Sequence, residues 1–211
     1  MSGVAELQVL FCGVGGQGVL RAAELFGRAL FAAGKRVNIG QLHGMSQRGG
    51  SVSSFVIVGA AEAALLDGAP DLVVALEPLE AARAADCFGA NTTVLVNAHA
   101  VVPYERTRQG HGYPEQAELL GRIAARAGRV LTANLSGALE PLGMARAVGV
   151  AMLGALSRQP AYLALGMPSG VLLDALGSSS DAKRAFALGA EATFLDCTTA
   201  QGTRDGLQAR H

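Results

Sequence analysis

The stretch Gly13–Gly18, with the sequence GVGGQG, limits the possible folds of this chain more than any other segment. Residues 8–12 before it form a short apolar run typical of a buried strand, and Val19–Ala33 after it has helical spacing. Its glycines have the G-x-G-x-x-G spacing of a phosphate-binding turn. The N–H groups that begin such a helix lack intrahelical acceptors and attract an anion. The stretch therefore predicts the start of a βαβ unit, with either an anion site or a tight turn that binds nothing.

The rest of the chain alternates short apolar runs with helical patterns. Residues 71–76 are mostly apolar and bounded by turn residues, which is typical of a central parallel strand covered on both faces. Glu77-Pro78 follows, and proline suits the first position of a helix. Further strands are predicted at 36–39, 52–58, 93–97 and 129–134, and helices at 79–85, 115–127, 145–157 and 181–194.

This alternation predicts an α/β fold with a doubly wound, mostly parallel, Rossmann-like sheet and a C-terminal helical extension. We expect residues 1–157 to form the Rossmann-like domain. Residues 158–211 are expected to be a linker, a helical extension and a polar tail of the same domain, with 158–180 as the linker. The apolar helix 145–157 is expected to lie buried in the domain or against another subunit.

Charge and cysteine content exclude several classes of function. Lys+Arg and Asp+Glu both number 17, so no net charge favours nucleic acid or an anionic membrane. Cys12, Cys87 and Cys197 are far apart, which fits a reducing cytoplasm, and they are too few for a four-thiolate iron–sulfur cluster. No targeting segment or membrane-spanning run stands out. We therefore expect a cytoplasmic protein that binds neither nucleic acid nor a membrane.

A second segment without periodicity, Gln41–Ser51, is predicted to be an ordered loop at the carboxyl edge of the sheet. Ligands of such sheets bind outside the carboxyl ends of the strands, where Glu77 and Asn97 are also expected. In this loop Arg48 could hold a phosphate or carboxylate through two parallel hydrogen bonds. The plainer alternative is that Arg48 makes an ion pair on the surface and that His43 only makes hydrogen bonds within its loop. For Glu77 we favour a helix N-terminal charge and no more.

The glycine turn lacks the acid that a dinucleotide site needs. Such a domain should carry Asp or Glu at the end of its second strand, to bond the ribose 2′-OH. Here that region reads Asn38-Ile39-Gly40-Gln41, and no acid occurs between Glu24 and Glu62. Lys35 lies before the strand and Arg36 at its start, so neither can bind a 2′-phosphate at its end. A role in binding NAD or NADP loses much of its support.

Taken together, the two loops resemble a known family. Gly13–Gly18, His43–Ser51 and the strand end Glu77–Glu80 occur in the order and at the distances typical of the gamma-type domain of 2-oxoacid:ferredoxin oxidoreductases. The chain is most similar to the small, beta subunits of indolepyruvate ferredoxin oxidoreductases, over about residues 9–156 and more faintly to Gly189. The family often has asparagine at the positions of Gly149 and Ala182, so local packing or a subunit contact is expected to differ there.

The resemblance implies a two-subunit enzyme that oxidatively decarboxylates an aryl 2-oxoacid, with CoA and oxidised ferredoxin, to an aryl-acetyl-CoA. Thiamine diphosphate and the [4Fe-4S] clusters belong to the large partner subunit, through which ferredoxin is served, and this chain binds neither cofactor. That agrees with the cysteine count and with the absence of any catalytic or metal-ligand set in the sequence. Reaction chemistry is then the cofactor's, while the protein supplies position and electrostatics.

The candidate binding residues lie in the two loops, and they face either the CoA pyrophosphate or only the large subunit. Two rival functions remain open from the sequence. One is a stand-alone Rossmann nucleotide-binding protein or NAD(P)-dependent oxidoreductase, and the other is an assembly protein that has lost its partner. The sequence assigns no side-chain pocket for the 2-oxoacid. The candidates are Gly13, Gly15, Gly16, Gln17, Gly18, His43, Arg48, Gly49 and Ser51.

Overall fold

One sheet runs through the molecule in the computed structural model, which describes residues 6–43, 50–59, 68–101, 112–168 and 170–198. Within these residues its strands are β1 Leu7–Val14, β2 Val37–His43, β3 Ser51–Val58, β4 Leu72–Ala75, β5 Thr93–Asn97, β6 Arg129–Ala133 and β7 Leu195–Asp196. Their order across the sheet is β2-β3-β1-β4-β5-β6-β7. The short apolar runs of the sequence thus become strands, and the predicted second strand extends further, to His43.

Strand directions confirm the mostly parallel α/β class and add a feature that the sequence did not predict. β1, β4, β5 and β6 are parallel neighbours. β3 lies between β1 and β2 and is antiparallel to both, so β2 runs in the direction of β1 without touching it. The expected βαβ unit is therefore split by an inserted strand. β7, also unpredicted, pairs antiparallel with β6 at the other edge.

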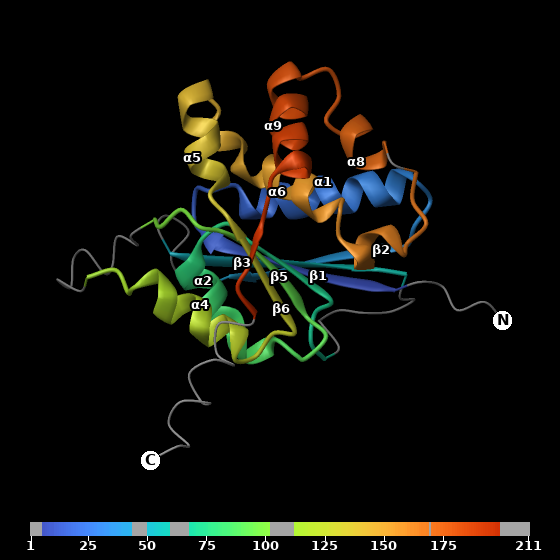
Figure 1. Ribbon diagram of the computed structural model, residues 1–211. Coiled ribbons are helices and arrows are strands. Elements are labelled where there is room, and N and C mark those ends of the chain that lie inside the picture. Colours follow the sequence, from blue (N-terminus) through green and yellow to red (C-terminus); the bar gives the residue numbers. More distant parts are fainter. Residues whose placement is uncertain (1–5, 44–49, 60–67, 102–111, 169, 199–211) are drawn as a thin grey trace, which may run out of the picture.

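Helices cover both faces of the sheet, as Figure 1 shows. On one face lie α1 Val19–Ala32, α5 Leu135–Leu139, α6 Val148–Leu156, α8 Val171–Asp174 and α9 Ser180–Glu191. On the other lie α2 Pro78–Ala84 and α4 Gln116–Ala124. The described part of the chain also contains α7 Pro160–Leu163 and the short 3-10 turns η1 Ala85–Cys87, η2 Glu140–Leu142 and η3 Ala145–Ala147. The doubly wound prediction is confirmed.

α6 is the central helix of its layer, and almost all of its residues are buried. Of the two alternatives for this apolar segment, burial within the domain is the one observed. It packs closely on α9, because glycines leave no side chain between the helix backbones. A Cβ at Gly189 would lie 1.7 Å from the carbonyl oxygen of Ala151, and one at Gly154 would lie 2.0 Å from that of Phe186. No larger residue fits at either position without moving a helix.

Residues 158–180 contribute buried side chains to the same core as α1. Tyr162, Leu165 and Leu172 are buried there, and the Tyr162 ring lies 6.2 Å from that of Phe26. The division of the chain at residue 157 stays a prediction. Among the described helices, none is long and apolar enough to cross a membrane.

Candidate functional site

The glycine turn and the second loop meet at the carboxyl edge of the sheet. β1 ends at Val14, which pairs with Ser51 at the start of β3. β2 ends at His43, whose register partner is Val52 of β3. The backbone N–H of Gly15 donates a hydrogen bond of 2.8 Å to the carbonyl of Gly50. The inserted strand β3 thus brings the two described ends of the second loop to the edge that holds the glycine turn, as the sequence predicted.

Backbone conformation explains the glycines of the turn. Gly16 has φ 103° and Gly18 has φ 85°, in the left-handed region that L side chains rarely adopt. Gly13 is needed for space instead, because a Cβ there would lie 2.8 Å from Gln17 Oε1 and 2.9 Å from Val19 Cγ2. Gly18 is the N-cap of α1, without a side-chain cap and with no acid in the first turn. The first N–H groups of α1 are therefore uncapped by side chains, as an anion site requires.

The side chain of Gln17 stabilises the turn through two hydrogen bonds. Its Oε1 accepts a hydrogen bond of 2.7 Å from Val14 N, and its Nε2 donates one of 3.2 Å to the carbonyl of Leu76. These bonds fasten the turn to the end of β4. The Gln17 side chain is thus engaged within the protein, which leaves the backbone of the turn as the part that can face a ligand.

The predicted loop residues are described to different extents. Ser51 is exposed at the start of β3, next to the turn. His43 ends β2, so the first three residues of the predicted loop, 41–43, belong to the strand. Arg48 and Gly49 lie outside the described residues. Contact of any of these residues with a ligand stays a prediction.

Asn97 links the end of β5 to the residue that follows β4 and to the start of α5. Its side chain is fully buried at the end of β5. The amide Nδ2 donates to the Leu76 carbonyl at 3.0 Å and to Ser136 Oγ at 2.9 Å, while Oδ1 accepts from Ser136 N at 3.2 Å. Leu76 therefore receives hydrogen bonds from both Gln17 and Asn97. Ser136 was missed by the sequence analysis, because only the fold brings the start of α5 next to β5.

Glu77 is a buried carboxylate at the end of β4. Its Oε2 accepts a hydrogen bond of 2.9 Å from Glu80 N, which confirms the prediction that it serves the start of α2. The expectation that Glu77 does no more than this was wrong, because its Oε1 also accepts hydrogen bonds from the Tyr113 hydroxyl and from Val101 N. Burial raises the pKa of Glu77, and the hydrogen bonds from Tyr113, Glu80 N and Val101 N oppose that rise in part.

A hollow of about 560 Å³ lies beside the glycine turn, between α1, the η3–α6 segment and the start of α9. Gln17 and Gly18 line its edge next to the turn, and we name it the Arg21–Arg146 hollow after two arginines that line it. Gly149 and Ala182 line it as well.

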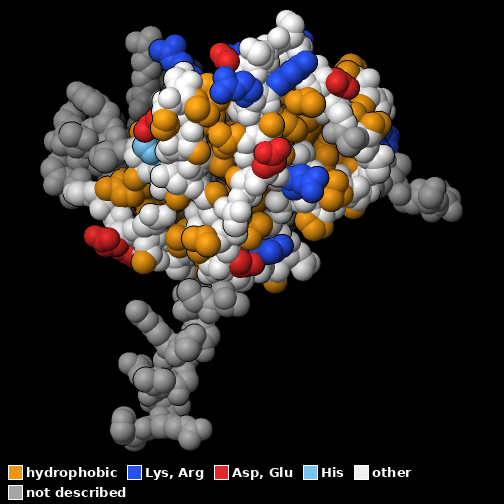
Figure 2. Space-filling view, turned by 45° about the horizontal axis from the view of Figure 1, so that its top comes forward, with side chains coloured by type: hydrophobic (Ala, Val, Ile, Leu, Met, Phe, Trp, Pro, Cys, Tyr) orange, Lys and Arg blue, Asp and Glu red, His pale blue; other side chains and the backbone are white. Residues whose placement is uncertain are grey.

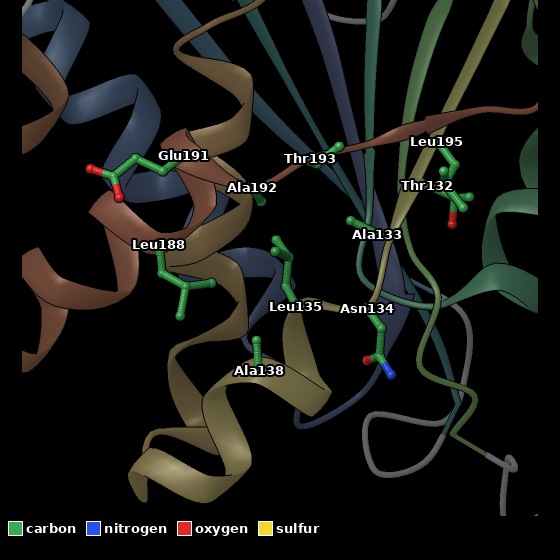
Figure 3. A pocket seen from close by; sticks show the side chains of 10 residues that line it. All are labelled: Thr132, Ala133, Asn134, Leu135, Ala138, Leu188, Glu191, Ala192, Thr193 and Leu195. Atoms are coloured by element: carbon green, nitrogen blue, oxygen red, sulfur yellow. The ribbon is translucent and has the colours of Figure 1, made fainter.

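Another hollow, of about 500 Å³, lies where β6 ends (Figure 3). Figure 3 shows Leu135 and Ala138 of α5 across from Leu188 of α9, with Asn134 and Glu191 at the margins. No described residue of the glycine turn lines it. Across the described parts of the chain, no group of three or more His, Cys, Asp or Glu side chains is placed to hold a metal ion.

Comparison with known proteins gives one consistent relationship. Residues 8–192 match the model of the pyruvate ferredoxin/flavodoxin oxidoreductase family. An indolepyruvate oxidoreductase subunit IorB of Archaeoglobus fulgidus is 38% identical over 152 residues, which is 72% of this chain and 76% of that protein. The subunit of the same name from Methanothermobacter thermautotrophicus is 34% identical over 155 residues, or 73% of this chain and 79% of that protein.

Solved structures show the same fold. The pyruvate oxidoreductase subunit PORC of Thermotoga maritima aligns with a TM-score of 0.60 at 20% identity, over 92% of this chain and 99% of that one. The gamma subunit of a keto/oxoacid ferredoxin oxidoreductase from Geobacter sulfurreducens gives 0.59 at 20% identity, over 87% and 95%. The chain therefore belongs to the pyruvate ferredoxin/flavodoxin oxidoreductase family, as the small subunit of a 2-oxoacid:ferredoxin oxidoreductase.

Proposed function

We propose that this chain is the small subunit of a cytoplasmic, ferredoxin-dependent oxidoreductase of indolepyruvate and related arylpyruvates, which forms aryl-acetyl-CoA and CO2. The support for the substrate class is the identity of 34–38% to two subunits that are named for indolepyruvate. The chain itself completes the CoA side of the active site and the interface to a large subunit. The observation that carries this assignment is the junction of the two loops, where Gly15 N–H meets the Gly50 carbonyl at 2.8 Å.

The hard chemistry of the reaction belongs to the large subunit in this proposal. Thiamine diphosphate would supply the carbanion chemistry there, and [4Fe-4S] clusters would pass the electrons to ferredoxin. Among the described residues, Cys12 is buried, Cys87 is exposed and Cys197 is half-buried, and no three or more His, Cys, Asp or Glu side chains are placed to hold a metal ion. By itself the subunit is inactive.

CoA fits the exposed backbone of the glycine turn. Its pyrophosphate is an anion, and the first N–H groups of α1 have neither a side-chain cap nor an acid beside them. A 2-oxoglutarate:ferredoxin oxidoreductase from Magnetococcus marinus, solved with coenzyme A and succinyl-CoA bound, contains the same fold with a TM-score of 0.60 at 16% identity. This chain aligns with 32% of that longer protein, which fits a subunit that supplies one wall of a larger site.

Strand order argues against the rival proposal of a stand-alone NAD(P) enzyme. In a dinucleotide-binding fold the second strand lies beside the first and presents an acid to the ribose at its end. Here the neighbour of β1 on that side is the antiparallel strand β3. β2 lies one strand further out, and its sequence VNIGQLH contains no acid. The ribose position therefore lacks both the strand and the carboxylate.

Reconstitution of the complex tests the proposal directly. The chain is produced with and without a large cysteine-rich subunit, and reduction of ferredoxin by indolepyruvate plus CoA is measured. We expect activity only with both subunits present, and no NADH fluorescence change with the isolated chain. Saturable NADH binding at about micromolar levels, or an active complex that does not need this chain, would contradict the proposal.

A further inference from the structure

The Arg21–Arg146 hollow has an apolar floor and a basic rim. Four apolar residues form this floor: Ala22 and Met144 are buried, and Leu25 and Val150 are half-buried. Arg21 of α1 and Arg146 of η3 stand exposed at its rim, from segments far apart in the sequence. Figure 2 shows arginine and lysine side chains among hydrophobic ones on this helical side of the molecule.

Neither arginine is neutralised by a neighbour among the described residues. No ion pair there includes Arg21 or Arg146, whereas Arg28, further along α1, pairs with Glu24 at 3.5 Å. The lining contains a single carboxylate, that of the exposed Asp181 at the start of α9. The hollow therefore keeps a net positive charge that an acidic group from outside can match.

We propose that the Arg21–Arg146 hollow docks an acidic segment of the large subunit. An apolar side chain of that segment lies on the floor, and flanking carboxylates pair with Arg21 and Arg146. This inference rests on the role of the chain as a small subunit. Arginine beside an apolar pocket is the pattern of residues that dominate protein–protein affinity.

The shape of the hollow favours a protein segment over a small anion. Sites for small molecules cover about 70–90% of their ligand. Here the rim is built from exposed residues, so a small molecule would remain largely in water, whereas a subunit surface would cover it. Exposed residues at the rim include Arg21, Ala145, Arg146, Ser179 and Asp181.

The place of the hollow next to the glycine turn also favours a segment of the large subunit as its occupant. Gln17 and Gly18 belong both to the lining of the hollow and to the glycine turn. A large subunit that docks in the hollow therefore lies next to the carboxyl edge of the sheet, where the CoA side of the site is proposed.

Charge reversal in the assembled complex tests the inference. Arg21→Glu, Arg146→Glu and the double variant are compared with Arg122→Glu, an exposed arginine on α4 across the sheet. The dissociation constant for the large subunit is measured at low and at moderate salt. We expect about a tenfold rise for each single variant and a larger rise for the double variant, with a flatter salt dependence. Arg122→Glu should change affinity less than about twofold.

Two outcomes would overturn the inference. One is a double variant that binds the large subunit with the affinity and salt dependence of the original chain. The other is unchanged affinity with a raised KM for CoA, which would make the hollow a small-anion site. The function proposed above can fail separately: the complex would then assemble through the hollow and yet not oxidise arylpyruvates with CoA.

Discussion

The backbone N–H of Gly15 donates a hydrogen bond of 2.8 Å to the carbonyl of Gly50. This bond exists because β3 turns back between β1 and β2 and places Ser51 opposite Val14. Two loops that are separate in the sequence thereby share one edge. The position of the glycine turn therefore depends on the residue that precedes β3.

Replacing Gly18 should destabilise the turn through backbone conformation alone. Gly18 has φ 85°, and a Cβ there would meet nothing within 4 Å. Gly18→Ala should lower the free energy of unfolding by about 1–2 kcal/mol. Gly18→Asn should cost less, because asparagine tolerates the left-handed region. Urea unfolding of both variants tests this, and equal losses would contradict the conformational explanation.

Asn97 and Ser136 should be coupled in stability. Asn97→Ala removes the buried hydrogen bonds that join Asn97 to Ser136, and it leaves the Leu76 carbonyl only the hydrogen bond from Gln17. The change should cost about 2 kcal/mol of unfolding free energy. In a double-mutant cycle with Ser136→Ala, the coupling energy should be about 1 kcal/mol. Additive losses in urea unfolding would show that the pair does not act as a unit.

Glu77 should make stability depend on pH. Burial raises its pKa above the ordinary value of 4.5, so the folded protein holds this proton to a higher pH than the unfolded chain does. The Glu77 contribution to the free energy of unfolding therefore falls as the pH rises from 4.5 through the raised pKa. Glu77→Gln has no proton to lose, and this part of the fall should disappear.

Chemical unfolding at about pH 5 and about pH 8 measures the effect. Glu118→Gln is the control, because Glu118 is exposed on α4. A pH dependence that is the same in Glu77→Gln as in the control would show that Glu77 does not titrate with folding.

Contact between α6 and α9 should not tolerate a methyl group at Gly189. The added Cβ would lie 1.7 Å from the Ala151 carbonyl oxygen, so the helices must separate. Gly189→Ala should lose about 3 kcal/mol of unfolding free energy. Gly112→Ala, where a Cβ meets nothing within 4 Å, is the matched control. Thermal unfolding of both variants tests this. Equal unfolding midpoints for Gly189→Ala and Gly112→Ala would contradict this description of the interface.

Local patterns in the sequence were enough to predict most elements of the sheet and its class. The apolar runs 71–76 and 93–97 match β4 and β5 closely, because strands covered on both faces must be apolar throughout. The direction of β3 could not be predicted, since the apolar run 52–58 is the same in either direction. β7 has only two residues, both exposed, and leaves no pattern.

The candidate site was predicted in part for a similar reason. Glycine spacing and the apolar strand before it located the turn, because both are local. Ser136 contacts Asn97, and Tyr113 contacts Glu77, only because the fold brings distant segments together. No local spacing in the sequence predicts such contacts. The Arg21–Arg146 hollow likewise combines helix starts from three distant segments.

The KM for CoA in the reconstituted complex tests the central claim most directly. Gly15→Ala adds a methyl group to the turn at a residue without a positive φ, so the turn can still form. Arg48→Ala removes the predicted phosphate partner, and Gly112→Ala and Arg122→Ala are the controls. We predict intact complexes in which the two loop variants raise the CoA KM about tenfold, with the KM for the 2-oxoacid unchanged. Complexes with unchanged activity and CoA KM, or loop variants that no longer co-purify with the large subunit, would contradict the claim.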